Sequence, residues 1–335
     1  MKTMLKGFIL SLLVVVIAAA ALIGIYAPMR ARNLEAKYTK FRAEFQSTHD
    51  AIDAGFNHHE RIVNGIKWHY VDEGAPKGRV ILFLHGLPEG WYSWRYILPL
   101  IDANYRLIAI DMKGYGRSDL QDKNYDWHHV ARQTVELMDA LDIRTFFVVG
   151  HDWGSLIGSV LVHDHPARIR GFVRMEADLI PKTGHERILT LLKKPQWILF
   201  RINRIATYLM RDPGFFIDRV YKSRMVTSLK KVDRDYLVYE FSRPGVAQIN
   251  PTYFNGKNWD LDTAIGEICK NNFSFPVLQL QADRDPAQPP SLFTDVSVKC
   301  PNVRMEWINN ASHFDNFDQP RQVADAINRF VNASK

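Results

Sequence analysis

The sequence predicts an α/β protein with a mostly parallel sheet, helices on both faces and an inserted helical segment. Short apolar runs that end in turn residues are typical of strands buried on both faces, as in "RVILFLHG", "YRLIAIDMKGYGRSD" and "RTFFVVGHD". The alternation of such strands with helices stops at about residue 180 and resumes after 272. The chain has 335 residues, 47% of them hydrophobic and 24% charged, so its length allows one large core and an insertion.

The elements follow one another in a regular order from residue 59 onward. The stretch "ERIVNGIKWHYVDEG" predicts a hairpin, because Asn64-Gly65 is a strong signal for a type I′ turn. Helices are expected at "YDWHHVARQTVELMDALDI" and "SLIGSVLVHDHPARI", because apolar residues recur there with a helical period. The remaining strands are expected at "GFVRMEADL", "FPVLQLQADRDP" and "NVRMEWINNASHF", with a last helix at "QPRQVADAINRFVN".

Composition divides the chain into five segments. The expected boundaries are 1–28 for a transmembrane anchor, 29–58 for a polar helical linker, 59–179 for the first part of the core, 180–272 for a helical cap and 273–335 for the second part of the core. In an open parallel sheet, ligands bind beyond the carboxyl ends of the strands. A cap inserted into such a core is therefore expected to cover a site at that edge.

The N-terminal segment contains an uncharged stretch, residues 7–27. A membrane-spanning helix needs about 20 apolar residues, whereas the apolar part of a signal peptide has about 7–15. The stretch therefore predicts a single-pass membrane anchor, and a cleaved signal with a secreted or periplasmic product is the alternative. More Lys and Arg residues follow the stretch than precede it, which favours a cytoplasmic position for the rest of the chain.

The net charge of +7 is concentrated in the cap, since residues 181–235 contain thirteen Lys and Arg but five Asp and Glu. A solvated basic face explains this excess, and a surface resting on anionic lipid headgroups is the sharper interpretation. Nucleic acid is not expected as a partner, because no binding motif accompanies the charge. Cys269 and Cys300 either pair or stay free, so they do not indicate a compartment.

The stretch "VVGHDWGSLIG" contains a nucleophile pattern, small-x-nucleophile-x-small, at a predicted strand-to-helix turn. Asp152 stands where serine is the usual nucleophile. Gly150 and Gly154 flank it at the positions where a side chain would crowd a tight turn. An aspartate that only caps the next helix is the alternative.

The stretch "HGLP", His85–Pro88, follows a predicted strand directly. A loop at this place supplies one backbone N–H of an oxyanion hole, here from Leu87, and the residue after the nucleophile, Trp153, supplies the other. Pro88 makes the Leu87–Pro88 bond a candidate cis peptide.

A histidine and a carboxylate to orient it follow other predicted strands. His313 comes just after the last strand, and Asp285 follows the strand before it. The chain order nucleophile, acid, histidine is the order expected of this arrangement, and Asp285 ranks first as the orienting carboxylate. Glu176, after the strand that follows the turn at Asp152, is the alternative from the other side. The stretch "HDHP" at 163–166 has no further ligands nearby, so no metal site is expected.

Four motifs, "HGLPEGWYSWR", "GHDWGS", "ADRD" and "SHF", together resemble those of the α/β-hydrolase-fold epoxide hydrolases, relatives of the haloalkane dehalogenases. The resemblance covers about residues 61–331 and implies an α/β-hydrolase fold. It implies Asp152 as the nucleophile, with His313 and Asp285 as the charge-relay pair.

The resemblance also implies cap tyrosines that protonate the opening epoxide oxygen. Tyr253 lies where one is expected, although Phe254 follows it where the family often has arginine, and Trp197 stands in the place of the other. The residues expected to bind substrate are His85, Pro88, Trp153 and Trp197.

An aspartate suits a different chemistry from a serine. Its reference pKa is about 3.9, so at neutral pH it attacks a saturated carbon without losing a proton and forms an alkyl ester. His313 then activates the water that hydrolyses the ester. The predicted function is hydrolysis of apolar or lipid-derived epoxides to vicinal diols without a cofactor. A haloalkane dehalogenase is the alternative, and a non-catalytic membrane-tethered binding protein on the same fold is a further one.

Overall fold

The computed structural model describes residues 31–178, 200, 202–255, 261–270, 274–293, 296–301 and 303–334. The chain forms two units, Met1–Ser47 and Thr48–Lys335, and the described residues of the first, 31–47, are helical. The predicted anchor at residues 7–27 lies outside the described residues. Within the described ranges, no helix is long and apolar enough to cross a bilayer. The anchor and the membrane localisation therefore stay predictions.

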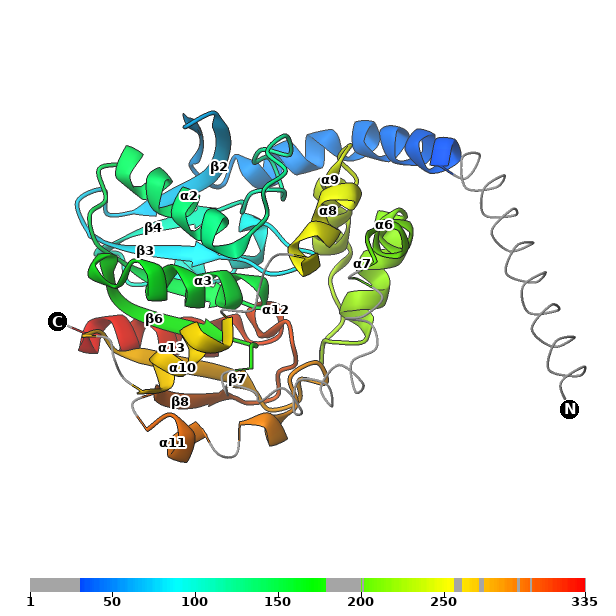
Figure 1. Cartoon of the computed structure of the whole chain (residues 1–335). Coiled ribbons are helices and arrows are strands. Elements are labelled where there is room, and N and C mark those ends of the chain that lie inside the picture. The colour runs from blue at the N-terminus through cyan, green and yellow to red at the C-terminus, as the bar shows by residue number, and fades with distance from the viewer. Residues whose placement is uncertain are drawn as a thin grey trace, which may run out of the picture. The chain divides into compact units, whose positions relative to one another are not determined.

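A single sheet forms the centre of the second unit (Figure 1). Within the described residues it has eight strands, in the order β1-β2-β4-β3-β5-β6-β7-β8. β2 is antiparallel to both β1 and β4, and all other neighbouring strands are parallel. The strands are β1 His58–Val63, β2 Ile66–Gly74, β3 Arg79–Leu84, β4 Tyr105–Ile110, β5 Phe146–His151, β6 Ile169–Met175, β7 Val277–Ala282 and β8 Val303–Ile308. The predicted α/β fold is confirmed.

The central strands are buried along nearly their whole length, as their continuous apolar sequences require. All six residues of β5 and all six of β7 are buried. Such strands have helices on both faces, because a parallel sheet needs crossover connections. At the edge of the sheet, Asn64 and Gly65 have φ of +49° and +82°, which are the positive values that a type I′ turn needs. The predicted hairpin between β1 and β2 is thus confirmed.

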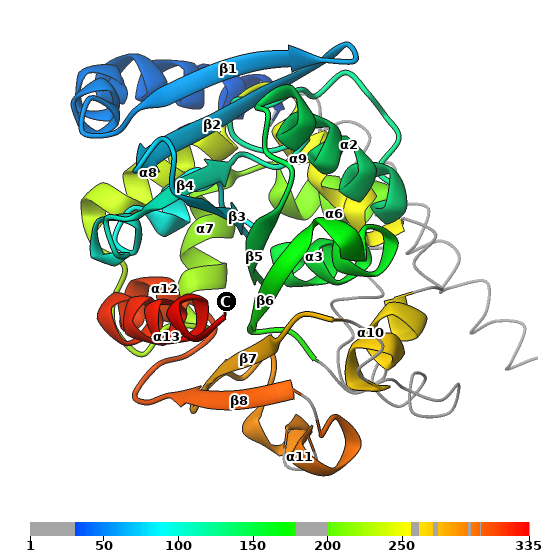
Figure 2. The same ribbon diagram turned by 90° about the vertical axis from the view of Figure 1, so that its left-hand side faces the viewer.

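Helices cover both faces of the sheet (Figure 2). On one face lie α2 (Trp127–Ala140), α3 (Trp153–Asp164) and α10 (Leu261–Lys270), and on the other lies α13 (Pro320–Ala333). The described part of the chain also forms α6 Asn203–Met210, α7 Pro213–Lys222, α8 Lys231–Phe241, α9 Val246–Ile249, α11 Val296–Lys299 and α12 Asp315–Asp318. The short 3₁₀ helices are η1 Trp91–Trp94, η2 Leu98–Leu100, η3 Pro166–Arg168, η4 Asn250–Asn255 and η6 Pro290–Leu292.

The described helices α6 to α9 interrupt the α/β core between β6 and β7, where the cap was predicted. α10 also falls inside the predicted cap segment, 180–272, but it packs against α3 of the core. Its residue Cys269 forms a disulfide with Cys300, at the end of α11. Of the two alternatives for the cysteines, pairing is the one in the structure.

The end of the segment predicted as a linker is part of the second unit, which begins at Thr48. His49 Nε2 lies 2.8 Å from Glu240 Oε1, and Asp53 accepts a hydrogen bond of 2.8 Å from the Tyr236 hydroxyl. These contacts fix residues 48–56 against α8 of the cap. The remaining predicted domain boundaries stay predictions.

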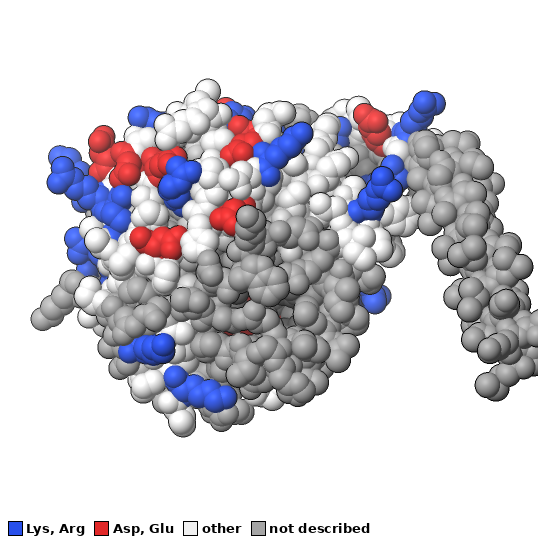
Figure 3. Space-filling view, viewed as in Figure 1, with Lys and Arg blue, Asp and Glu red and all other residues white. Residues whose placement is uncertain are grey.

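The surface carries both signs of charge. Figure 3 shows Lys and Arg side chains interspersed with Asp and Glu over the described part of the face in view. Some charged side chains of the described residues form pairs, as Arg132 does with Glu136 at 2.6 Å and Arg168 with Asp139 at 2.7 Å. Exposed pairs of this kind contribute about 0–1 kcal/mol each, so they affect solubility more than stability.

Candidate active site

Asp152 sits on a sharp turn between β5 and α3. Its φ of 49° and ψ of −113° are unfavourable for a residue other than glycine. The turn is so tight that a Cβ on Gly150 would lie 2.4 Å from the carbonyl oxygen of Gly154, and one on Gly154 would lie 2.0 Å from that of Leu84. Two glycines are therefore required here, and the strained aspartate projects beyond the carboxyl end of β5.

The loop after β3 holds the Asp152 carboxylate. The backbone N–H of Leu87 donates a hydrogen bond of 3.0 Å to Asp152 Oδ1, which is the geometry expected of one oxyanion-hole donor. The Leu87–Pro88 peptide is cis, as predicted. Trp153 is the first residue of α3, so it follows the carboxylate directly.

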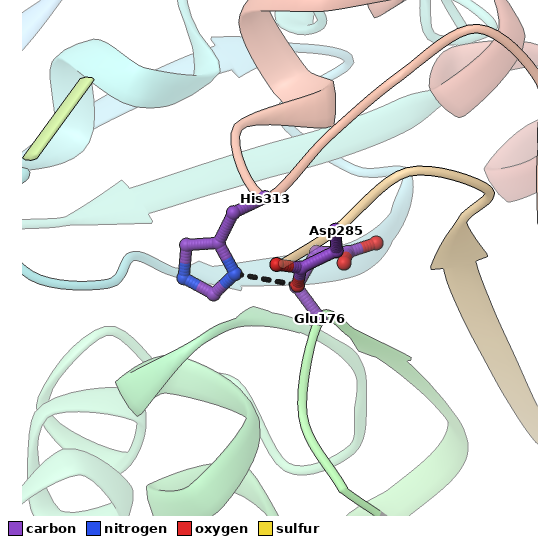
Figure 4. A group of neighbouring side chains, drawn as sticks. All are labelled: Glu176, Asp285 and His313. Atoms are coloured by element: carbon purple, nitrogen blue, oxygen red, sulfur yellow. Dashed lines mark hydrogen bonds and ion pairs between the residues drawn. The ribbon is translucent and has the colours of Figure 1, made fainter. Parts of the chain in front are cut away.

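His313 lies between two carboxylates. Its Nε2 is 3.3 Å from Asp152 Oδ2, and its Nδ1 donates a hydrogen bond of 2.8 Å to Asp285 Oδ2 (Figure 4). The three residues follow the carboxyl ends of β5, β7 and β8, which meet at one edge of the sheet. The structure thus brings together the predicted nucleophile, base and orienting acid.

Glu176 lies behind Asp285 and does not orient His313 (Figure 4). It accepts hydrogen bonds of 2.6 Å from the backbone N–H of Ala282 and from the Gln281 side chain. Burial, with the negative charges of Asp315 and Asp285, raises the pKa of Glu176 well above its usual value. A hydrogen bond between the carboxyl groups of Glu176 and Asp285 requires one proton, and the raised pKa of Glu176 places that proton on Glu176.

Polar atoms of Glu176, Asp285 and His313 lie within 4.8 Å of one another, a spacing that suits a metal ion. The hydrogen bond from His313 Nδ1 to Asp285 Oδ2 uses two of these atoms, however. A protonated carboxyl is also a poor metal ligand, since ligands must lose their protons to bind. The group is therefore better explained as a charge relay.

The charges of Asp152 and His313 stabilise each other. Burial alone would raise the pKa of Asp152, but the hydrogen bond and charge of His313, with the charge of His151, hold it below its usual value. Burial alone would lower the pKa of His313, but the charge of Asp285 and hydrogen bonds to Asp152 and Asp285 raise it to about 10. The resting site therefore holds Asp152, the predicted nucleophile, as a carboxylate beside an imidazolium.

A cavity of about 80 Å³ lies above Asp152. Its floor is polar and comes from the core, and its walls are mainly aromatic and aliphatic side chains of the cap. It is lined by Leu87, Asp152, Trp153, Phe200, Phe216, Val220, Arg224, Phe254, Ala287, Gln288 and His313. This composition suits a largely apolar small molecule whose reacting atom rests on Asp152.

Comparison with known proteins agrees with this geometry. A family model described as the alpha/beta hydrolase fold matches residues 79–320. The chain belongs to the α/β-hydrolase-fold family. Epoxide hydrolase 3 of Xenopus tropicalis is 27% identical over 283 residues, which cover 80% of this chain and 75% of that protein. Epoxide hydrolase 2 of Caenorhabditis elegans is 28% identical over 297 residues, covering 83% of this chain and 80% of that protein.

Solved structures show the same fold. The structure of epoxide hydrolase CorEH without ligand superimposes with a TM-score of 0.72 at 21% identity, covering 84% of this chain and 100% of that one. In this α/β-hydrolase-fold chain the strained turn, the loop after β3 and the histidine after β8 all stand at the carboxyl ends of the sheet strands.

Two residues predicted to bind substrate do not line the cavity. His85 is fully buried, where its Nδ1–H donates to the Gly86 carbonyl at 2.8 Å and its Nε2 accepts from the Met112 N–H at 2.9 Å. Burial lowers the pKa of His85, in keeping with a neutral ring that fixes the loop. Pro88 is buried in the same loop, away from the cavity lining. Of the other two, Trp153 lines the cavity and Trp197 lies outside the described residues.

The structure does not support Tyr253 as the proton donor. Its side chain is fully buried, and its hydroxyl donates a hydrogen bond of 2.5 Å to the Lys113 carbonyl. Its ring packs 5.4 Å from that of Tyr115 and 5.2 Å from that of Tyr125. Neighbouring residues of the short helix η4 point in different directions, so Phe254 lines the cavity instead.

His151, next to Asp152, forms a buried ion pair with Glu89 that the sequence does not predict. His151 donates from Nδ1 to Glu89 Oε2 at 2.9 Å and from Nε2 to the His313 carbonyl at 2.7 Å. Burial alone would lower the pKa of His151, but the charge and hydrogen bond of Glu89 raise it to about 9. The pair thus holds the backbone of His313 through the hydrogen bond from His151 to the His313 carbonyl. Both residues stand inside the quoted motifs, but only the fold brings them together.

Proposed function

We propose that this protein is an epoxide hydrolase that converts epoxides to vicinal diols through an alkyl ester on Asp152. The observation that carries the proposal is a half-buried carboxylate, held by the Leu87 N–H at 3.0 Å and by His313 Nε2 at 3.3 Å, at the base of a largely apolar cavity. The curated relatives named epoxide hydrolases support the same reaction.

The first step forms the ester. Asp152 attacks a ring carbon, a new C–O bond forms, and the C–O bond of the epoxide breaks to leave an alkoxide. The alkoxide needs a proton, and the Tyr253 hydroxyl is bound to the Lys113 carbonyl. Of the described groups that line the cavity, His313 carries a proton that it can give up, since its pKa is raised to about 10, whereas the Arg224 guanidinium keeps its protons. We therefore assign the proton transfer to the His313 imidazolium, which leaves a neutral imidazole.

The second step hydrolyses the ester. Neutral His313, oriented by Asp285, takes a proton from water as the water oxygen attacks the Asp152 carbonyl carbon. The Leu87 N–H stabilises the resulting oxyanion. As the intermediate collapses, the leaving alkoxide takes the proton from His313. The Asp152 carboxyl then returns its own proton to His313, which restores the starting ion pair.

Incubation of the purified protein with styrene oxide and 1-bromobutane tests the proposal. The expected result is phenylethanediol from the epoxide, and an acid-quenched sample in which the Asp152 peptide is heavier by the mass of styrene oxide. Release of bromide without diol formation would instead indicate a haloalkane dehalogenase. Release of neither product, with no mass increase, would favour a non-catalytic binding protein.

The uncharged stretch 7–27 supports a second element of this proposal, a membrane tether. The disulfide between Cys269 and Cys300 favours an oxidising compartment for the catalytic unit, against the weak charge preference for the cytoplasm. Protease digestion of intact and opened membrane vesicles tests the orientation. Protection of the catalytic unit in vesicles whose lumen is oxidising is expected, and recovery from a soluble fraction would contradict the tether.

A further inference from the structure

We propose that Arg224 binds a carboxylate on the substrate, so that the preferred epoxides carry a carboxylate close to the ring. The inference rests on the proposed function and names the substrate class of that site. Three independent features of Arg224 support it: its place in the cavity, the firm attachment of its backbone, and a guanidinium that forms no ion pair with any described residue.

Arg224 lines the same cavity as Asp152 and His313. It lies in the segment between α7 and α8, and the core fixes this segment at several points. The N–H of Phe314, next to the base, donates to the Arg224 carbonyl at 3.4 Å. Asp318 of α12 accepts hydrogen bonds of 2.9 Å and 2.8 Å from the backbone N–H groups of Val226 and Thr227. The arginine is thus held by the same stretch of chain that carries the catalytic histidine.

The Arg224 guanidinium forms no ion pair within the described part of the chain, and its one side-chain hydrogen bond, to Ser223 Oγ, is long at 3.5 Å. Other arginines that are buried or half-buried have partners: Arg174 donates to Gln279 Oε1 at 3.0 Å, and Arg95 pairs with Asp233. A guanidinium has five N–H donors, and a carboxylate accepts two of them side by side. Arg224 therefore offers unused donors to a ligand in the cavity.

The electrostatics of the cavity also favour an anionic ligand at this point. Burial lowers the pKa of Arg224 while the charges of Asp152 and Asp285 raise it, and arginine stays protonated in proteins. An anion approaching Asp152 is otherwise repelled by the nucleophile itself, and Arg224 offsets that repulsion. Phe216, Val220 and Phe254 supply apolar walls beside the charge. The expected ligand thus combines an apolar body with one carboxylate.

The shared cavity also limits where the carboxylate stands on the substrate. Because Arg224 and Asp152 line one small cavity, the carboxylate lies near the reacting carbon and not at the far end of a long chain. Short epoxy acids with an apolar substituent meet this requirement. A fatty-acid epoxide with a remote carboxylate does not.

A pair of epoxides with one skeleton tests the inference: 3-phenylglycidate, which carries the carboxylate, and 3-phenylglycidol, which carries a hydroxymethyl group instead. The measured quantity is the ratio of kcat/KM for the acid to that for the alcohol. Charge-assisted hydrogen bonds of this kind correspond to a preference of about 10- to 100-fold for the acid in the unaltered protein. Arg224→Gln is expected to lower the ratio by a similar factor. Arg219→Gln, on α7 outside the cavity lining, is the matched control and should keep it.

The possible outcomes separate the two proposals. Turnover of both epoxides with a ratio that Arg224→Gln leaves unchanged overturns the carboxylate site and leaves the epoxide hydrolase intact. An equal slowing of both epoxides by Arg224→Gln has the same meaning, because the arginine then acts on the reaction and not on the carboxylate. Turnover of neither epoxide by the unaltered protein overturns the proposed function and, with it, the inference. Thermal unfolding of each variant confirms that it is folded.

Discussion

The core side and the cap side of the cavity differ in how directly the local sequence determines the direction of their side chains. On the core side, Asp152, Asp285 and His313 all follow strand ends, and their polar atoms lie within 3.3 Å of a partner in one relay. On the cap side, the aromatic pair Tyr253 and Phe254 divides between the protein interior and the cavity, with the hydroxyl on the interior side. The core thus positions the predicted reacting groups, and the cap shapes the cavity that a substrate has to enter.

The difference has a physical cause. A parallel sheet brings the carboxyl ends of its strands to one edge, so the strand itself largely determines the position of a residue that directly follows it. A residue in a short helix of the cap points wherever its neighbours allow, and a buried hydroxyl needs a partner. Removal of core residues should therefore abolish the reaction, whereas changes in the cap should alter its selectivity or the stability of the fold.

Asp152→Asn should have the largest effect. An amide does not attack the epoxide, so kcat/KM is expected to fall by at least about 10³-fold, with no ester in the quenched protein. Steady-state kinetics and intact mass measure the two effects. A variant that keeps turnover would show that the core side does not hold the nucleophile.

Asp285→Asn should have the next largest effect, a loss of about 10²- to 10⁴-fold in kcat, because His313 loses the charge that orients it and raises its pKa. Glu176→Gln should cost less than about 10-fold, since Glu176 is already neutral. Asp283→Asn, two residues before Asp285, is the matched control and should leave kcat unchanged. If Glu176→Gln were the more damaging of the two, the roles of the carboxylates would be reversed.

Above the acid range in which Asp152 becomes protonated, the rate of ester formation should depend on pH only at high pH. Asp152 has a pKa below its usual value and is ionised across the neutral range, while His313 donates a proton only when it is charged. The rate should therefore be level at neutral pH and fall as the pH rises past about 10, the pKa of His313. Rapid-quench measurement of the first turnover tests this. A rate that does not fall at high pH would show that another group protonates the alkoxide.

The charge of His313, paired with Asp152 and Asp285, also stabilises the fold. This stabilisation is lost as the pH rises, whereas that of a paired carboxylate is lost as the pH falls. The folded-state pKa of His313, about 10, lies above its ordinary value of 6.5. Its contribution to the free energy of unfolding is thus complete below the ordinary value and is lost as the pH rises through the folded one. Replacing His313 with glutamine should remove that part of the pH dependence.

Tyr253→Phe should have the smallest effect on catalysis, a change of less than about 3-fold in ester formation, because its hydroxyl is bound to the Lys113 carbonyl. The orphaned carbonyl should lower the free energy of unfolding by about 1–3 kcal/mol. Phe254→Tyr is the reciprocal change and places a hydroxyl on the cavity wall, so it should alter ring opening more. A loss of 10²-fold or more from Tyr253→Phe would restore Tyr253 as the donor.

The same contrast explains what the sequence predicts. Local sequence patterns predict backbone geometry. They therefore predict the alternation of strands and helices, the tight turn between the glycines around Asp152, and the placement of Asp152, Asp285 and His313 after strand ends. The direction of Tyr253, the pairing of Glu89 with His151 and the position of Arg224 in the cavity lining depend on contacts between residues far apart in the chain. His85 shows the limit within the core, since a motif histidine proves to hold the loop and not the substrate.

Oxygen transfer in a single turnover tests the central claim most directly. An excess of the protein is mixed with styrene oxide in water enriched in the heavy oxygen isotope, and both the diol and the Asp152 peptide are analysed by mass spectrometry. If Asp152 is the nucleophile, the diol of the first turnover contains only light oxygen, because its new oxygen comes from the enzyme, and the Asp152 peptide becomes heavier. Heavy oxygen in the first diol, with an unlabelled peptide, would show that water opens the ring directly and would contradict the account.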